Sequence, residues 1–338
     1  MKMKILFPLC TLALLLAGAG CNKAGKLSQA TNSPLPTGPM ELKLKWPPGE
    51  RVVQDMDMKT TSETTIPGRP APMQQNMTMG QKYGLTVLQA EPDGGHEVEM
   101  EFLSSRMGMA INGSKMMEYD SDKKSPGDTT NPVAGIFGKM IGSKIQFFMD
   151  ASNNVERIEG VDEMMSRLTA AAPPASVAAI KNMMTEGYFK QMMSSSRFMP
   201  PNAVSPGDSW PVQLEFPMAP LGTLVLDYTF TLADWEKHGK RNCARMDFTG
   251  TIKTKPGSAG AAPGPMGMTM TIKDGSTTGT AWFDPDLGIT IDTTMNQDMT
   301  IGIVLPKNPK ATTGPGSQPQ TLTTHMIQDI TVKLDSVN

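Results

Sequence analysis

The sequence predicts a mainly β fold with a short helical insertion (α+β), in which two similar antiparallel β units form an extended curved sheet or split barrel. Three observations support this prediction. Apolar and polar residues alternate with a period of two in several segments, which is typical of half-buried antiparallel strands. The 338 residues include 32 glycines and 28 prolines, too many for a mostly helical chain. Turn and strand motifs also recur in the same order in both halves of the chain.

The N-terminus has the features of a lipoprotein signal peptide. Lys2 and Lys4 precede the apolar stretch Ile5–Ala17, which is too short for a stable membrane span, and small residues lead on to Cys21. This pattern resembles a bacterial lipobox, although Gly18 stands where that pattern usually has leucine. The resemblance implies that Cys21 is the lipid attachment site. An ordinary secretory signal is the alternative, but no A-x-A cleavage site follows closely.

These features predict a lipid-anchored protein of the cell envelope that faces the periplasm and contacts the membrane through the lipid on Cys21. Asn22 follows the cysteine where aspartate would favour retention in the inner membrane of enteric bacteria, so the resemblance favours the outer membrane. Lys and Arg number 31 against 33 Asp and Glu. This balance argues against nucleic-acid binding, which requires a basic face.

The chain divides into five expected parts. The polar segment after the signal lacks large apolar residues, which indicates a flexible tether. The parts are a signal peptide (1–20), a tether (21–40), a first β unit (41–160), a helical insertion (161–200) and a second β unit (201–338).

Four segments show the strand pattern most clearly, and turn-forming residues connect several of them. The predicted strands are Glu97–Leu103, Val225–Leu232, Ala244–Phe248 and Met326–Val337, the last with one irregularity. The predicted tight turns are Glu91–Gly95, Lys237–Lys240 and Asp284–Gly288. Longer hairpin tips are expected at 67–72, 256–267 and 306–319.

The two halves match in order. Pro47–Glu50 resembles Ser205–Trp210, and the segment Phe147–Val155 resembles Ala281–Ile289. Between these motifs, two consecutive strands of the first half resemble two of the second half; they are Tyr83–Ala90 and His96–Ser104, against Tyr228–Trp235 and Asn242–Gly250. Two such units would each cover an edge of the other.

The segment between the halves is predicted to be helical. Asp162 is the expected N-cap of a helix over Glu163–Ala172. A second helix carries an apolar stripe at spacings of three and four and ends at Pro200; the stripe residues are Val177, Ile180, Met184, Tyr188 and Met192. Such a pair can cover a sheet face or roof a cavity.

Together with the lipobox, three motifs resemble a family of uncharacterised bacterial lipoproteins. They are Tyr119-Asp120-Ser121, the V-x-x-I-x-G-V-D-E pattern of Val155–Glu163, and the stretch from Pro200 to Trp210 that contains the P-G-D-S-W turn. The likeness extends over most of residues 40–335. It implies a β-rich architecture and brings no known activity.

The sequence shows no catalytic motif and implies no cofactor, so we expect a protein that is not an enzyme. His96 and His238 fall in matching hairpin turns, and His325 has no acid–base partner nearby in sequence. Asp284–Gly288 and Asp120–Asp122 resemble fragments of calcium loops but lack the remaining ligands, so turn geometry is the favoured interpretation. Cys243, the one cysteine outside the signal and the lipid site, has no basic neighbours that would make it reactive.

The 30 methionines are the unusual feature of the composition. Many occur as M-x-M, which puts both thioethers on one face of a strand. Soft thioethers bind Cu(I), and the weak candidates for such a site are Met266, Met268 and Met270. Methionine is also an adaptable apolar filler, so a Met-rich core or a surface that moulds to apolar ligands explains the same pattern.

From these features we expect a non-catalytic binding or scaffolding module, for an apolar ligand or an envelope protein partner. A Cu(I)-binding or oxidant-buffering protein is the alternative, and a hydrolase is third.

Overall fold

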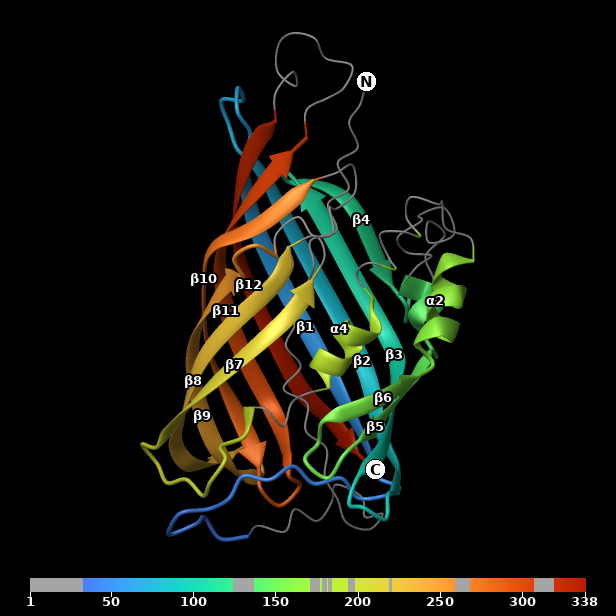
Figure 1. Ribbon diagram of the computed structural model, residues 1–338, viewed down its shortest axis with the longest axis vertical. Coiled ribbons are helices and arrows are strands. Elements are labelled where there is room, and N and C mark those ends of the chain that lie inside the picture. The colour runs from blue at the N-terminus through green and yellow to red at the C-terminus, as the bar shows by residue number, and fades with distance from the viewer. Residues whose placement is uncertain are drawn as a thin grey trace.

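Twelve strands form one antiparallel sheet in the computed structural model, which describes residues 33–123, 137–170, 177, 181, 184–193, 198–218, 221–258, 268–306 and 319–338 (Figure 1). The strand order is β6-β5-β3-β2-β1-β12-β11-β10-β9-β8-β7, and β4 pairs with β3. The strands of the first half are β1 (Arg51–Thr65), β2 (Met73–Ala90), β3 (His96–Ile111), β4 (Ser114–Asp120), β5 (Lys144–Met149) and β6 (Val155–Glu159). Those of the second half are β7 (Ser209–Met218), β8 (Gly222–His238), β9 (Arg241–Thr254), β10 (Thr269–Asp284), β11 (Ile289–Leu305) and β12 (Gln320–Val337).

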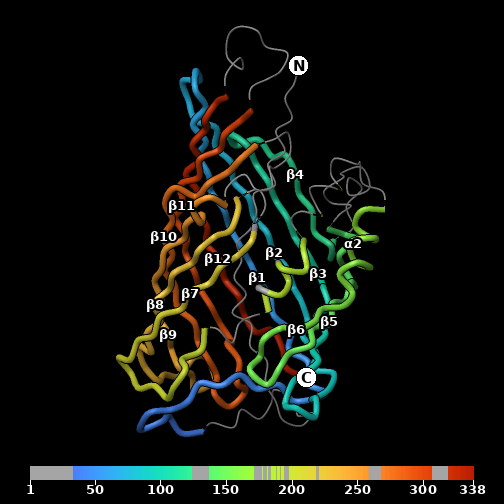
Figure 2. Tube along the Cα trace, in the orientation of Figure 1, coloured from blue at the N-terminus to red at the C-terminus, as the bar shows by residue number. Residues whose placement is uncertain are grey.

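The first and last strands of the chain meet in the middle of this sheet. β1 pairs with β12 from Val52↔Val337 to Thr65↔Thr323, and the blue and red traces run side by side in Figure 2. β6 and β7 are the edge strands, so the sheet is strongly curved but not closed. The predicted curved antiparallel sheet is confirmed.

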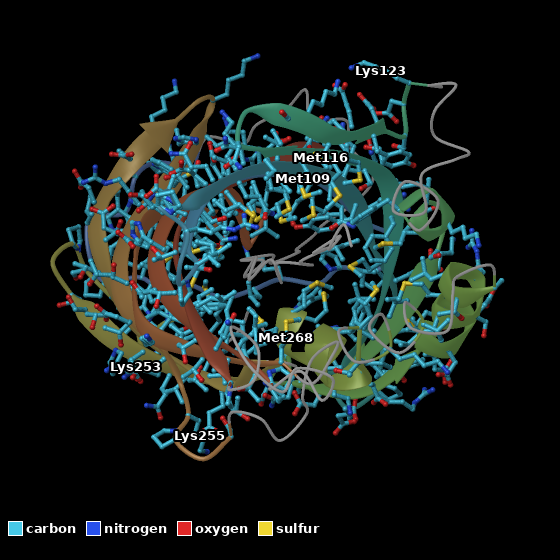
Figure 3. The ribbon with its side chains drawn as sticks, turned by 90° about the horizontal axis from the view of Figure 1, so that it is seen from above. Met109, Met116, Lys123, Lys253, Lys255 and Met268 are labelled. Atoms are coloured by element: carbon cyan, nitrogen blue, oxygen red, sulfur yellow. The ribbon has the colours of Figure 1, made fainter. Side chains whose placement is uncertain are left out.

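The two faces of the sheet differ in chemistry, because side chains alternate along each strand. The buried face lies on the inner side of the curve, where Met109 and Met268 are found, whereas Lys253 and Lys255 lie outside (Figure 3). The outer face carries ion pairs across strands, for example Arg106 to Asp55 at 3.0 Å. We call these two surfaces the inner face and the outer face.

The four clearest strand predictions are confirmed within β3, β8, β9 and β12. The irregularity expected in the last strand is also present, because the register of β12 against β1 shifts between Val53 and Gln54. The three predicted tight turns connect antiparallel neighbours, and Gly94, Gly239 and Gly288 adopt positive φ there.

Corresponding turns of the two halves make the same hydrogen bonds. The N–H of Gly49 donates to the carbonyl of Val87 at 2.8 Å, and the N–H of Val87 donates to the carbonyl of Glu50 at 2.9 Å. In the second half, the N–H of Gly207 donates to the carbonyl of Leu232 at 2.7 Å, and the N–H of Leu232 donates to the carbonyl of Asp208 at 2.9 Å. One continuous sheet contains both halves, so their division into two similar units stays a prediction.

The helices differ from their predicted bounds. Helix α2 is Val161–Thr169, and its N-cap is Gly160 in the left-handed conformation, with no side-chain cap. Predicting Asp162 as the cap was therefore wrong. A Cβ on Gly160 would lie 2.5 Å from the carbonyl oxygen of Lys144, so glycine is needed for this close approach, and Asp162 instead lies in the first turn, where a carboxylate favours the helix dipole.

Of the second predicted helix, the structure describes α4 (Glu186–Met192), while Ile180 lies outside the described residues. α2 packs against β5, and α4 contacts both β6 and β7, the two edge strands. Helix α4 therefore lies across the opening of the sheet, whereas α2 lies beside it (Figure 1). Within the described part of the chain, no helix is long and apolar enough to cross a membrane.

Candidate binding face on the inner side of the sheet

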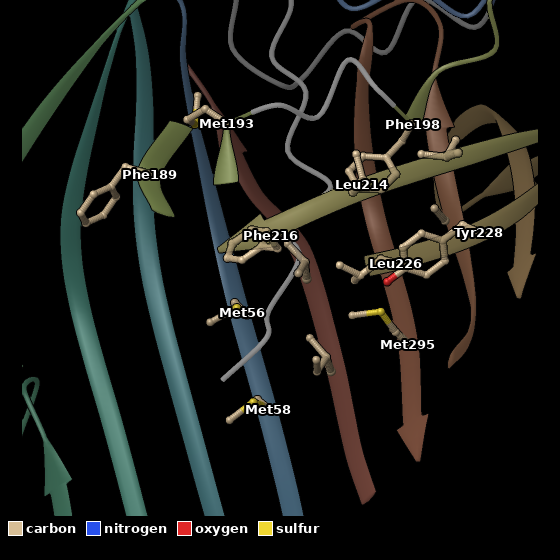
Figure 4. Packing of buried hydrophobic residues seen from close by; sticks show 14 of the residues in the cluster. Met56, Met58, Phe189, Met193, Phe198, Leu214, Phe216, Leu226, Tyr228 and Met295 are labelled. Carbon is tan, nitrogen blue, oxygen red and sulfur yellow. The ribbon is translucent and has the colours of Figure 1, made fainter. Parts of the chain in front are cut away.

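Helix α4 and the residues after it cover part of the inner face beside the edge strand β7. Phe189 and Met193 are buried, and so is Phe198 just beyond the helix (Figure 4). The carbonyl of Phe198 accepts a hydrogen bond from the indole Nε1 of Trp210 at 2.9 Å. Its ring lies 6.4 Å from Tyr228, so this segment forms an aromatic cover over β7 and β8.

A row of polar side chains crosses the middle of the inner face. Each residue of the row is directly opposed to the next one on the neighbouring strand. The opposed pairs are Thr60↔Gln328, Gln328↔Gln297, Gln297↔Thr277, Thr277↔Gly250 and Gly250↔Tyr228, which run from β1 through β12, β11, β10 and β9 to β8. We call this row the polar ladder; its members are Thr60, Gln328, Gln297, Thr277 and Tyr228. All five are buried, and the two glutamines are fully buried.

Four atoms of the polar ladder have no hydrogen-bond partner among the described residues: Oε1 of Gln297, Oε1 of Gln328, Oγ1 of Thr277 and the hydroxyl of Tyr228. Each buried, unpaired polar group costs about 1–3 kcal/mol of stability. The side-chain nitrogens of the two glutamines also make weak hydrogen bonds. Nε2 of Gln297 donates to the sulfur of Met295 and Nε2 of Gln328 to the sulfur of Met58, both at 3.7 Å, and thioether sulfur is a weak acceptor. Gln328 also donates to Thr60 at 3.1 Å.

Gly250 allows the ring of Tyr228 to lie across β9. A Cβ at this glycine would lie 2.5 Å from Cδ1 of Tyr228, so the ring occupies the space that any other side chain would need. Burial raises the pKa of the Tyr228 hydroxyl above its ordinary range, which keeps it a protonated donor.

The rows on either side of the polar ladder are mainly apolar. One side carries Met58, Ile330, Met295, Phe248 and Phe230, and the other carries Met326, Met299, Ile252 and Leu226. Among the buried polar side chains of the described residues, Asp284 is the one charged group, and it lies at the end of β10. The two rows beside the ladder are thus mainly apolar, with Ser62 opposite Met326 as an exception, and further buried polar side chains of the same face lie beyond these rows at Thr64, Thr324 and Thr293.

Six methionines lie together where the polar ladder reaches β1 and β2. Met77, Met109 and Met117 form one row, which continues from Thr60 of the ladder through the opposed pairs Thr60↔Met77, Met77↔Met109 and Met109↔Met117. Met58, Met79 and Met107 form the neighbouring row through the opposed pairs Met58↔Met79 and Met79↔Met107. We call these six residues the methionine cluster. Cα atoms of opposed residues lie about 4.5–5.5 Å apart, so neighbouring thioethers can converge. Met79, Met107 and Met109 are only half-buried, which leaves this cluster reachable from solvent.

The structure places the predicted site residues elsewhere. Met268 and Met270 are buried at the start of β10, and Met266 lies outside the described residues, as does Cys21. The M-x-M pairs of the methionine cluster are visible in the sequence, but their proximity depends on strand register and could not be predicted from it.

The histidines occupy three different settings. His96 lies beside Trp46, with ring centroids 6.3 Å apart, and burial lowers its pKa. His238 stacks on Trp282 at 4.3 Å, and its Nε2 lies 3.0 Å from Asp292 on the outer face.

His325 has an acidic partner that is distant in the sequence. Its Nε2 lies 2.6 Å from Oδ1 of Asp298, on the neighbouring strand β11. The two residues are 27 positions apart in the chain, so only the pairing of β11 with β12 brings them together. Both side chains are about half exposed, so this is a surface contact.

Asp284 holds a turn. Its Oδ1 accepts the backbone N–H groups of Asp286 and Leu287 at 2.8 and 3.0 Å, and its Oδ2 accepts from Arg241. Asp120 likewise accepts the N–H of Asp122 at 3.0 Å. No group of three or more His, Cys, Asp or Glu side chains among the described residues is arranged to hold a metal ion. Both calcium-loop fragments therefore serve turn geometry.

Cys243 is fully buried, and burial raises its pKa to about 12. This thiol is kept protonated at neutral pH. Trp210 is buried at the start of a strand, since β7 begins at Ser209 and the indole is enclosed.

The polar ladder is absent from the sequence predictions, although the sequence carries a signal for it. In the middle of β11 every second residue is buried, and Gln297 is one of these, between Met295 and Met299. In β12, Gln328 is likewise a buried residue between Met326 and Ile330. A glutamine in an apolar phase of a strand is a polar group placed in the interior. Only the pairing of the strands shows that the two meet.

The comparisons with known proteins give a family and distant folds. A family model described as "Family of unknown function (DUF6263)" matches residues 93–290. No curated protein matches the chain. Lipovitellin, in a structure described by its lipid–protein interactions, is 9% identical with a TM-score of 0.40, and the match covers 87% of this chain but 26% of lipovitellin. DynF from the dynemicin biosynthesis pathway of Micromonospora chersina is 8% identical with a TM-score of 0.19, covering 93% of this chain and 92% of DynF. Both scores are below 0.5, so neither likeness bears on ligand or function.

Proposed function

This chain belongs to the DUF6263 family, whose function is unknown, and we propose that it is a lipid-anchored, non-catalytic binding module of the cell envelope whose inner face holds an apolar ligand. The observation that carries this proposal is the chemistry of the inner face. Apolar side chains, many of them methionines, line it on both sides of the polar ladder, while the charged side chains lie outside. Flexible thioethers mould to apolar ligands of varied shape.

The position of the helical insertion supports a ligand held between sheet and helix. α4 contacts both edge strands, and Phe198 covers Tyr228 and Phe230 from the helix side. A segment joined to the sheet mainly at its edges can open more readily than the sheet itself, because local opening breaks few contacts. The aromatic cover is therefore the expected entrance.

Extraction of the purified full-length protein with organic solvent, followed by mass spectrometry, tests this proposal. We expect one apolar compound to be recovered in a fixed ratio to protein. Phe198→Ala removes part of the cover and should speed release of the compound or of an apolar dye. Phe148→Ala is the matched control, because Phe148 lies under Arg157 at 3.4 Å, away from the cover. If nothing is extracted and no dye binds, the proposal is wrong.

The lipid anchor on Cys21 is supported by the lipobox-like sequence at the end of the signal peptide. Mass spectrometry of the N-terminal peptide tests it directly. Cys21→Ser should abolish the lipid mass, and Cys10→Ser, within the same signal, should leave it unchanged. Fractionation of the two membranes then tests the preference for the outer one. An unmodified Cys21 in membrane-derived protein would contradict the anchor.

A Cu(I)-binding or oxidant-buffering role is the second candidate, and the methionine cluster favours it. Three thioethers from Met77, Met109 and Met117 stand in one row, and soft sulfur ligands select Cu(I). Replacing these three with leucine should abolish copper uptake under reducing conditions. Replacing Met266, Met268 and Met270 with leucine is the matched control, and an equal loss there would move the site to β10.

We also propose that the sheet contains two similar β units. The matched hydrogen bonds of Gly49 and Gly207 support this, as does the order of motifs in the two halves. Gly49→Ala and Gly207→Ala should destabilise the protein by similar amounts, since both glycines have positive φ, 84° and 95°. Unequal losses in urea unfolding would argue against equivalent turns.

A further inference from the structure

The polar ladder restricts which apolar ligand the inner face can hold, and this inference rests on the proposed function. We propose that the ladder binds the hydroxyl-bearing head group of an uncharged amphiphile, whose apolar chain lies along the rows beside it.

The hydrogen-bonding inventory of the ladder identifies the head group. Oε1 of Gln297 and Oε1 of Gln328 accept hydrogen bonds, whereas the hydroxyls of Thr277 and Tyr228 can also donate. None of these four atoms has a partner among the described residues. A ligand group that both donates and accepts matches this row, and a hydroxyl is the simplest such group.

The register places these atoms on one line. Gln328 and Gln297 are directly opposed, Gln297 is opposed to Thr277, and Thr277 is opposed to Gly250, over which the ring of Tyr228 lies. A head group with two neighbouring hydroxyls can therefore contact two ladder residues at once. The thioethers that the two amides now contact at 3.7 Å compete weakly.

The absence of charge on the inner face excludes an ionised head group. Asp284 is the one charged residue among the buried polar side chains that the structure describes, and Arg241 pairs with it at the end of β10. A carboxylate or phosphate at the ladder would be a buried ion without a counter-charge, which is strongly unfavourable. The ligand is therefore neutral.

The apolar rows give the chain of the amphiphile its place. Met58, Met295 and Phe248 lie on one side of the ladder, and Met326 and Met299 on the other. Because these flanking residues are apolar, the chain of the amphiphile packs against them while its polar group is bound at the ladder.

The experiment compares three probes that share one acyl chain. Monoolein carries two hydroxyls, methyl oleate carries no donor, and oleate carries a charge. Binding to the full-length chain in lauryldimethylamine N-oxide, a detergent without hydroxyl groups, is measured by native mass spectrometry at a fixed micelle concentration. Partitioning into micelles is then the same for every variant, so differences between variants report on the protein.

In the wild type we expect monoolein to bind about tenfold more tightly than methyl oleate, and oleate to bind most weakly. The double variant Gln297→Met and Gln328→Met keeps the side-chain length and removes both acceptors, so the preference for monoolein should fall to about one. Thr277→Val should reduce the preference partly. Gln213→Met, on the exposed face of β7, is the control and should keep it.

The outcomes separate the two proposals. If no probe binds to the wild type, both the apolar-ligand function and the head-group site are wrong. If all three bind equally, or if the double variant keeps the preference, only the head-group site is wrong. If water alone satisfies the ladder, monoolein shows no preference in the wild type, which also overturns the site. Melting temperatures establish that each variant is folded.

Discussion

Gln297 and Gln328 face each other across β11 and β12, fully buried, and both amide carbonyl oxygens are without a partner among the described residues. Their nitrogens point to Met295 and Met58 at 3.7 Å. The Gln328 nitrogen also donates to Thr60 at 3.1 Å, but two adjacent amides with unpaired carbonyl oxygens are a costly arrangement in an interior. This cost is understandable if the pair serves a ligand, because binding would supply the missing bonds.

Arg241 is predicted to be essential for stability. It pairs with Asp284, whose side chain is 1% exposed, and Arg241→Met would leave a buried carboxylate without its partner. The expected loss is about 3–5 kcal/mol of unfolding free energy, measured by urea denaturation.

The control for this change is Arg245→Met. Arg245 is 37% exposed and lies 3.8 Å from Glu236, so its loss should cost about 1 kcal/mol or less. Equal losses in the two variants would contradict the buried-pair argument.

Glu50 predicts a specific pH dependence. Burial raises its pKa to about 7 from the ordinary 4.5. The folded state therefore binds the proton more tightly than the unfolded state, so stability is fully present below about pH 4.5 and declines as the pH rises towards 7. Urea unfolding at several pH values should show this decline in the wild type and lose it in Glu50→Gln.

Glu63→Gln is the matched control, because Glu63 is exposed. It should retain the decline of the wild type. A decline of equal size in Glu50→Gln would assign the pH dependence to another group.

Gly250→Ala is predicted to destabilise the sheet and weaken ligand binding together. The new Cβ would lie 2.5 Å from the Tyr228 ring and 2.6 Å from the carbonyl oxygen of Asp227, and overpacking of this kind costs about 1–3 kcal/mol. Gly187→Ala in α4 meets nothing closer than 3.8 Å and should be neutral or stabilising. Thermal melts and probe binding measure both effects, and an unchanged Gly250→Ala protein would refute the close packing.

Cys243 is predicted to be unreactive in the folded protein. Its burial and its pKa of about 12 leave almost no thiolate at pH 8. Titration with a thiol reagent should give the same count for the wild type and Cys243→Ser in buffer, and one thiol fewer for the variant in urea. A difference already present in buffer would mean that the thiol is accessible.

The strands were predictable from sequence and the site was not, for one physical reason. Period-two alternation is local, so segments such as Val225–Leu232 identify themselves. The polar ladder and the methionine cluster depend on which residue faces which across strands up to 268 positions apart, as Thr60 and Gln328 are. The N-cap of α2 was mispredicted for a related reason. Glycine is required at position 160 because the backbone of Lys144, on β5, lies too close for a side chain, and this contact is not visible in the local sequence.

The pairing of β1 with β12 sets the order in which this protein can fold. The central seam of the sheet needs residues from both ends of the chain, so it cannot form until Val337 has emerged. Such non-local pairing is slow, and until it forms β1 and β11 both present open edges. A variant without β12 would lose the seam between the two halves and leave two unpaired strand edges, so β12 is the strand whose pairing completes the sheet.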